Sequence, residues 1–467
     1  MLRRSRLRRP LLVLSAAALL LLVGTGCGGD ADADLAGPDV PPPADPSGDD
    51  ASDGPPTEPS GDPEPAEPTP GEPPDDDAGA NDGAGADDGA GADDGPDGGP
   101  IRAVWVHLFD DTLKSTASIE RLVAEVVDAG ADTLIAQVAR RHDAYYTSTV
   151  LPRTADPQLA DGLDVLATLL DVTASTELRV HAWISVAPTW HRSYDDLDHP
   201  AGWLPMAHGS RAPVADRWVT RTADGVWTDY LDVALPEVTD HVVAIVEELL
   251  ADYAVDGVHL DYLRYEADDR GYHPDALARF ARETGQTGTP HPTDPVWSDW
   301  RRDQTRNLVA EVRAAMDATG TAAELSAPVI TWGAPPAGTT LEGTRGHRDA
   351  LQEWDRWARE GLVDVLYPMN YFRAHDAEQA AWFDGWIAYQ ARLDAATPTR
   401  IAAGVGGWLN RSDAVLEQVR AAMAATGAVG LYSFQQPTDE DRATLLARLA
   451  DTGWGERADE WSDPGER

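Results

Sequence analysis

The residues with the clearest chemical meaning lie in the segment Asp256–Tyr265, which reads DGVHLDYLRY. Because side chains alternate along a strand, His259 and Asp261 share one face of it and the apolar residues share the other. A carboxylate that points into the interior of a barrel costs free energy unless it is paired or used. Arg264, just beyond the strand, could pair with Asp261 and hold it ionised. The segment therefore predicts either a reactive carboxylate at Asp261 or a structural Asp–Arg or Asp–His pair.

The histidines do not follow the spacing of a metal site. Those at His181, His191, His199, His208 and His259 show neither an i, i+4 pair nor a His-x-His pair. We therefore predict no catalytic metal and no cofactor, so that carboxyl groups carry the chemistry.

The elements that would position Asp261 begin at Ile101, where short apolar runs start to alternate with helical segments. Eight such repeats predict a parallel sheet covered by helices, and they favour a closed (β/α)8 TIM barrel, an α/β fold, over an open sheet. No Gly-x-Gly-x-x-Gly follows the first strand, which argues against a dinucleotide fold. The predicted strands are 102–109, 133–138, 180–186, 257–264, 324–330, 363–371, 401–408 and 428–435. Apolar spacing near 3.6 predicts helices that include 118–129, 163–174, 238–253, 300–319 and 413–425.

Loop lengths indicate which face of the barrel is functional. Long segments follow the third, fourth and fifth predicted strands, at about 187–237, 265–299 and 331–350. They leave the carboxyl ends of strands, where barrel enzymes have their active sites. The returns from helix to strand are short, so Asp261 is expected to open onto the face with the long loops.

The first 27 residues predict export. Five arginines within residues 1–10 precede the apolar run Leu11–Val23, which is short for a membrane span. Small residues then lead to Cys27, the only cysteine. The sequence Gly-Thr-Gly-Cys resembles the lipobox of bacterial lipoproteins, although Gly24 stands where leucine is usual. It implies a lipid on Cys27 that anchors the chain in a membrane, and plain secretion is the alternative. Gly28 in place of an aspartate favours the outer membrane or the cell surface.

Residues 28–100 contain no lysine or arginine and are built mainly of Gly, Pro, Ala, Asp and Glu. This composition predicts a disordered, self-repelling linker. The chain carries a net charge of −43, with five arginines in residues 1–10 and 22 acids in residues 28–100, which leaves −26 for residues 101–467. Such a domain will not bind nucleic acid by bulk attraction. We expect a monomer whose barrel, residues 101–450, precedes a polar tail at 451–467.

Several motifs stand in one order along the barrel. They are AVWVHL (Ala103–Leu108), QV with DAYY (Gln137, Asp143–Tyr146), HAWIS (His181–Ser185), LPEV (Leu235–Val238), DGVHLDYLRY and YPMNY (Tyr367–Tyr371). In this order they resemble glycosyl-hydrolase-like family 10, a group of bacterial lipoproteins, from the first strand to the eighth. The resemblance implies a TIM-barrel glycosidase that acts on bacterial cell-wall or related amino-sugar glycans. The chain departs from the family at Ala139-Arg140, where Arg-Pro is frequent, and at Ser185, where asparagine is common.

Chitinase-type barrels end their fourth strand in Asp-Gly-x-Asp-x-Asp-x-Glu, and the last residue is their catalytic acid. In register with that motif, His259 takes the first inner aspartate, Asp261 the second, and Leu263 replaces the acid. Substrate-assisted hydrolysis with that acid is therefore excluded. The comparison implies that Asp261 is the nucleophile or the base of a different arrangement.

Glycosidic cleavage ordinarily uses two carboxyl groups, about 5 Å apart for retention and farther apart for inversion. We favour Asp143 as the second, because it lies in a matched motif beside Tyr145, and Asp232 next, because it precedes LPEV. Beyond Glu324 at its amino end, the fifth predicted strand offers Ser326 and no carboxylate. A surface acid in an acidic chain is the alternative for each candidate. Other acids of the predicted loops are Asp110, Asp111 and Asp229.

Sugars bind to aromatic faces and to planar polar groups, and such side chains lie near the predicted strand ends. Packing is the alternative role of each aromatic residue. The predicted substrate-binding residues are His259, Arg264, Gln137, Tyr145, Trp183, Asn370, Tyr371, Trp408 and Gln435.

Together these patterns predict a glycoside hydrolase that acts on bacterial envelope glycan of the peptidoglycan type, with Asp261 as its key carboxylate. Two alternatives stay open. One is a barrel that binds carbohydrate without cleaving it, because no second acid is as well placed as Asp261. The other is a hydrolase of an exopolysaccharide or another glycan.

Overall fold

The computed structural model describes residues 99–190, 200, 202–434 and 442–454. The predicted signal segment with Cys27, nearly all of the linker, Gln435 and most of the tail lie outside these residues. No helix within them is long and apolar enough to cross a membrane.

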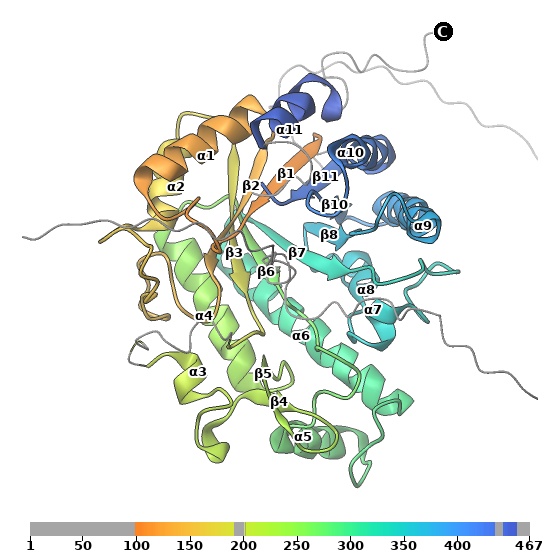
Figure 1. Ribbon diagram of the computed structural model, residues 1–467. Helices are drawn as coiled ribbons and strands as arrows, with labels where there is room; N and C mark the ends of the chain where they lie inside the picture. Colours follow the sequence, from red (N-terminus) through yellow and green to blue (C-terminus); the bar gives the residue numbers. More distant parts are fainter. Residues whose placement is uncertain (1–98, 191–199, 201, 435–441, 455–467) are drawn as a thin grey trace, which may run out of the picture. The chain divides into compact units, whose positions relative to one another are not determined.

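In the described part of the chain, parallel strands at eight positions close into a barrel, which confirms the predicted fold (Figure 1). The order runs β10-β11-β1-β2-β3-β6-β7-β8, and the pairing of Gly404 with Met369 closes it. At one of the eight positions the strand is interrupted at Ala402 and is divided into β9 and β10. The barrel strands are β1 (Ile101–Val106), β2 (Thr133–Ala139), β3 (Arg179–Ser185), β6 (Gly257–Asp261), β7 (Glu324–Ile330), β8 (Val365–Met369), β9 (Arg400–Ile401), β10 (Ala403–Gly406) and β11 (Ala428–Tyr432).

Helices surround the strands, as Figure 1 shows, and bury their apolar outer faces. Val104, Ala136 and Leu260 are fully buried there, so the main hydrophobic core is the layer between the barrel and its helices. These helices are α1 (Thr116–Asp128), α2 (Val165–Thr173), α4 (Pro236–Asp252), α6 (Pro295–Thr319), α8 (Trp354–Arg359), α9 (Ala377–Asp394), α10 (Ser412–Thr426) and α11 (Arg442–Arg448).

Several strands end earlier than the apolar patterns predict. β6 ends at Asp261 and not at 264, because Tyr262 adopts a φ of 61°, which breaks the extended backbone. β1 ends at Val106, three residues before the predicted end. Asp261 is therefore the last residue of its strand, at the mouth of the barrel.

The long segments predicted as loops contain structure of their own. The segment after β3 holds α3 (Leu204–Ala207), a short 3-10 turn (Val214–Asp216) and an antiparallel hairpin, β4 (Val219–Arg221) with β5 (Trp227–Leu231). The next holds α5 (Pro274–Thr284) and the first turn of α6, and the third holds α7 (Arg345–Arg348). Figure 1 shows β4, β5 and α5 gathered at one side of the barrel. The four-residue helices α3 and α7 and the two hairpin strands carry too little periodic pattern to be predicted, whereas α5 has 11 residues, buries Ala276 and Phe280, and was missed.

Large rings fill the barrel interior, and two glycines make room for them. A Cβ on Gly430 would lie 2.5 Å from Cζ3 of Trp105, and a Cβ on Gly257 would lie 2.6 Å from Cε1 of His181. Trp105 packs edge-on against Tyr367 at a centroid distance of 5.1 Å. The interior is therefore a packed core and not a channel.

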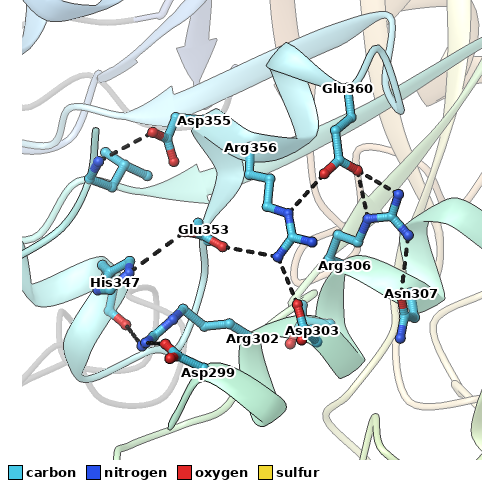
Figure 2. A network of polar contacts seen from close by, with 12 residues as sticks. Asp299, Arg302, Asp303, Arg306, Asn307, His347, Glu353, Asp355, Arg356 and Glu360 are labelled. Atoms are coloured by element: carbon cyan, nitrogen blue, oxygen red, sulfur yellow. Dashed lines mark hydrogen bonds and ion pairs between the residues drawn. The ribbon is translucent and has the colours of Figure 1, made fainter. Parts of the chain in front are cut away.

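A network of ion pairs joins α6 to α8 on the outside of the barrel (Figure 2). Arg356 is its centre, with Asp303 at 2.7 Å, Glu353 at 3.4 Å and Glu360 at 2.8 Å. Arg306 Nε donates to Glu360 at 2.6 Å, so Glu360 bridges two arginines. The network connects the two helices, and Arg302 of α6 also donates to the carbonyl oxygen of His347 in α7 at 3.1 Å.

The chain packs against the barrel beyond the predicted boundary at Ala450. A π-helical turn, Leu449–Gly453, follows α11 and leads to Trp454. Trp454 is buried, and its Nε1 donates to the carbonyl oxygen of Ala129 at 2.7 Å. The described part of the predicted tail therefore belongs to the domain.

Candidate active site

Asp261 is partly exposed at the carboxyl end of β6, opposite Ser185 of β3. Its Oδ2 accepts a hydrogen bond from Trp183 Nε1 at 3.2 Å, and its Oδ1 accepts one from the Tyr262 amide at 2.7 Å. Burial raises the pKa of Asp261 to about 6, although the charge of Arg264 and these two hydrogen bonds act to lower it. A carboxyl group with that pKa can exchange a proton near neutral pH.

Four aromatic side chains form a wall beside Asp261, which we call the aromatic wall: Trp183, Tyr371, Trp408 and Tyr432. The ring of Tyr432 lies 6.3 Å from Trp183, 5.7 Å from Tyr371 and 5.5 Å from Trp408, between centroids. Burial raises the pKa of Tyr371 and Tyr432, and the negative charge of Asp261 adds to both shifts. The wall therefore brings together three predicted binding residues around the central carboxyl group.

Tyr432 was missed in the sequence. It is the last residue of β11, in line with the inward-facing Ala428 and Gly430. That alternation was present in the eighth predicted strand and would have indicated a side chain at the barrel mouth.

Arg264 lies over two aromatic rings at the mouth. Its guanidinium carbon is 5.0 Å from the centroid of Tyr262 and 5.4 Å from that of Trp332. Its positive charge lowers the pKa of both Asp261 and Glu266. Among the described residues no ion pair joins Arg264 to Asp261, so the predicted pairing is limited to this effect of its charge.

Glu266 is a carboxyl group that sequence reasoning overlooked. It lies five residues after Asp261 and pairs with Arg270 Nε at 3.1 Å. Burial raises its pKa, while Arg270 and Arg264 act in the opposite direction. Since Arg264 acts on both carboxyl groups, Glu266 belongs to the same electrostatic environment as Asp261.

Asp143 and Tyr145 lie within the loop that follows β2. Asp143 is 2% exposed and its Oδ1 accepts from the Arg141 amide at 3.2 Å. Burial raises its pKa, against a hydrogen bond from Thr154. Tyr145 is fully buried and donates to Asp156 Oδ2 at 2.8 Å. Both side chains are thus engaged in holding this loop.

Asp232 follows β5 and is fully buried. Its Oδ1 accepts from the Ala234 amide at 3.1 Å, and burial raises its pKa, against the charge of His273. Among the described residues no hydrogen bond joins Asp143 or Asp232 to Asp261. Both acids take part in hydrogen bonds of their own segments, and the charge of Arg141, which acts on Asp261, also lowers the pKa of Asp143.

His259 lies one inward position below Asp261, in the barrel interior. Trp105 Nε1 donates to His259 Nε2 at 3.0 Å, and His259 Nδ1 lies 2.9 Å from Ser326 Oγ. Because an indole nitrogen can only donate, Nε2 is the acceptor and Nδ1 carries the proton. Burial lowers the pKa of His259 well below its ordinary value. Both ring nitrogens are engaged, so His259 supports the interior and has no free ring nitrogen for a substrate.

Polar contacts continue from this histidine toward the opposite end of the barrel. Ser326 Oγ also lies 3.1 Å from His181 Nδ1, and His181 Nε2 lies 3.3 Å from Glu324 Oε2. Ser326 of β7 thus links two buried histidines.

The two described amide residues among the predicted binding groups are engaged by the protein. Gln137 Oε1 accepts from the Leu108 amide at 3.0 Å, and its Nε2 donates to Ser185 Oγ at 3.2 Å. Asn370 exchanges two hydrogen bonds of 2.9 Å with Gln390 of α9. Both fix the ends of strands that surround the mouth. Across the described residues, no cluster of three His, Cys, Asp or Glu side chains is suited to a metal ion.

Comparison with known proteins agrees with this architecture. The family model described as Glycosyl hydrolase-like 10 matches residues 100–408. Glycosyl hydrolase DigH of Escherichia coli (strain K12) is 24% identical over 292 residues, which cover 59% of this chain and 62% of that protein. Glycosyl hydrolase YngK of Bacillus subtilis (strain 168) is 25% identical over 306 residues, which cover 58% and 54%. The chain therefore spans less than two thirds of the length of these relatives.

Solved structures with a similar fold include two glycosidase domains. The glycoside hydrolase domain of PgaB from Bordetella bronchiseptica has a TM-score of 0.50 and 16% identity, over 76% of this chain and 99% of that one. The catalytic domain of beta-amylase from Paenibacillus polymyxa has a TM-score of 0.54 and 11% identity, over 75% and 98%. These similarities concern the barrel fold.

Proposed function

Because the chain belongs to the glycosyl hydrolase-like 10 family, we propose that it is a glycoside hydrolase with Asp261 as its key carboxyl group. Its proposed substrate is bacterial envelope glycan of the peptidoglycan type. The observation that carries this proposal is the position of Asp261 at the carboxyl end of β6, hydrogen-bonded to Trp183 and bordered by the aromatic wall. Active sites of TIM barrels lie at this end of the strands.

In the proposed reaction the ionised Asp261 acts as nucleophile or base at the anomeric centre. The N–H groups of Trp183 and Tyr262 hold its two oxygens in place, so little reorganisation is needed. The rings of Tyr371, Trp408 and Tyr432 provide faces on which a pyranose can stack.

We propose Glu266 as the partner that protonates the leaving oxygen. Burial raises the pKa of Glu266, as it does that of Asp261, and the charge of Arg264 acts on both carboxyl groups. An acid with a raised pKa beside an ionised carboxylate is the usual pairing in glycosidases. Asp143 and Asp232 are less suitable, because both side chains are almost completely buried, whereas Glu266 is partly exposed.

The location of the protein is a separate proposal. We propose that the chain is exported and anchored through a lipid on Cys27, in the outer membrane or at the cell surface, with residues 28–100 as the linker. Metabolic labelling with a radioactive fatty acid tests this. Label should enter the wild-type protein and be lost in Cys27→Ser, and an unlabelled wild-type protein would refute the anchor.

The catalytic proposal is tested by incubating the purified protein with peptide-free peptidoglycan glycan strands and with a neutral amino-sugar exopolysaccharide. We expect new reducing ends and shorter fragments from the peptidoglycan strands, identified by mass. Fragments from the exopolysaccharide alone would support the alternative substrate. Binding of strands without any cleavage between pH 4 and 9 would support a carbohydrate-binding barrel.

A further inference from the structure

Arg264 differs from the other arginines near the mouth in how it is held. Within the described residues it forms no ion pair, and its side chain donates no hydrogen bond. Arg270 is paired with Glu266 at 3.1 Å. Arg345, which lies over the same Trp332 ring at 5.8 Å, is paired with Asp349 at 3.0 Å. The N–H groups of Arg264 are therefore available to a ligand.

The surroundings of Arg264 restrict its position without occupying its donors. The side chain is partly exposed and lies over the rings of Tyr262 and Trp332. Contact with aromatic faces engages the plane of a guanidinium, whereas its hydrogen-bond donors lie along the edges. A guanidinium held in this way matches the geometry of a carboxylate, which accepts two parallel N–H bonds.

The charge of the molecule makes this arginine notable. The barrel and tail carry a net charge of −26, so the surface as a whole repels anions. Beside Asp261, however, two guanidinium groups act on the carboxyl group, those of Arg264 and Arg141. An anionic ligand at this site must be recognised locally, by a donor with a free edge.

Resting on the proposed function, we propose that Arg264 is the specificity-determining residue for a carboxylate-bearing sugar, which it binds next to the ring that is cleaved at Asp261. The substrate class is therefore an acidic glycan, and a neutral glycan with the same backbone is a poor ligand. A purely electrostatic role, in which Arg264 only keeps Asp261 ionised, predicts no dependence on the charge of the substrate.

The test measures equilibrium binding and turnover separately. The probes are a tetrasaccharide of alternating N-acetylglucosamine and N-acetylmuramic acid with free lactyl carboxylates, and the same tetrasaccharide with those carboxylates reduced to alcohols. Calorimetry gives the ratio of the two dissociation constants for the wild type, Arg264→Gln, Arg264→Lys and Arg345→Gln. The last variant is a matched control, because it removes the same charge from another arginine that lies over the Trp332 ring.

We expect the wild type to bind the acidic form at least about 10-fold more tightly than the reduced form. The ratio should fall to about 1 in Arg264→Gln, take an intermediate value in Arg264→Lys because a point charge lacks the planar fork, and persist in Arg345→Gln. Equal affinity of the wild type for both forms, no binding of the acidic form, or a ratio that survives in Arg264→Gln would each overturn the proposal. If the ratio of dissociation constants is as expected but no turnover occurs, the proposed hydrolysis is refuted and the proposed role of Arg264 in binding is not.

Discussion

The indole Nε1 of Trp183 donates a hydrogen bond of 3.2 Å to Oδ2 of Asp261. The two residues come from neighbouring strands, β3 and β6, in which Trp183 is level with His259 and Ser185 is level with Asp261. The donor thus reaches the carboxyl group from one position deeper in the barrel. This bond acts against the burial that raises the pKa of Asp261 to about 6.

Replacing Trp183 with phenylalanine keeps an aromatic ring and removes that donor. The ionised form of Asp261 loses a stabilising bond, so its pKa should rise above about 6. If the ionised form reacts, kcat increases with pH through this pKa. The rise of kcat should therefore occur at higher pH in Trp183→Phe than in the wild type. The pH–rate profiles of the two proteins test this, with Trp300→Phe as a control, because its Nε1 bonds Glu283 on the outside. If kcat rises at the same pH in the wild type and in Trp183→Phe, this role of Trp183 is contradicted.

Trp408 provides a partly exposed ring in the aromatic wall, 4.8 Å from Tyr371 between centroids. Trp408→Ala should raise KM about 5- to 10-fold and change kcat less, because stacking on a sugar acts on the bound substrate and on the transition state alike. Steady-state kinetics measure both constants. Trp382→Ala on α9, where the ring contacts Phe372, is the control and should leave KM unchanged. A fall in kcat alone would argue against a binding role.

His259 should remain a neutral imidazole with its proton on Nδ1. Trp105 can only donate to Nε2, and burial lowers the pKa of the ring. Nitrogen chemical shifts of the labelled protein should therefore report one protonated Nδ1 and one unprotonated Nε2 at every pH from 5 to 8. A shift to the doubly protonated form near pH 6.5, the value of a free histidine, would contradict the hydrogen-bond pattern.

The network around Arg356 should add little stability despite its three carboxylate partners, because Arg356 is 39% exposed. Arg356→Gln should lower the free energy of unfolding by less than about 1 kcal/mol, and added salt should reduce the loss. Denaturant titration at low and high salt measures it. Arg282→Gln, an exposed position on α5, controls for the change in net charge. A loss of several kcal/mol that is independent of salt would show a packing role for Arg356 instead.

The barrel was predictable because its signals are periodic and repeated. Eight apolar runs with helices between them fix the topology, and β7 (Glu324–Ile330) has the predicted bounds. The shortened end of β6 was not predictable, because it depends on the positive φ of Tyr262. Tyrosine rarely adopts this conformation, and nothing in the local sequence indicates it.

Site residues on the strands could be predicted from the alternation of side chains, whereas those in the connecting segments could not. Trp183 and Asp261 occupy inward positions on neighbouring strands, and a hydrogen bond joins them. Glu266 and Asp232 lie in connecting segments, where the local pattern does not tell whether a carboxyl group turns toward the mouth or into the core. His259 was predicted to bind substrate, but its partner Trp105 comes from a strand 154 residues away, so their contact follows from barrel closure.

The most direct measurement is the rate at which purified Asp261→Asn releases reducing ends from peptide-free peptidoglycan glycan strands, compared with the wild type. We predict a loss of at least about 1,000-fold, with the circular dichroism spectrum and the affinity for the strands retained. Glu266→Gln should also be impaired, mainly on substrates with poor leaving groups, if it is the acid. Undiminished release by Asp261→Asn, or a wild type that releases nothing from glycan strands that it binds, would contradict the central claim.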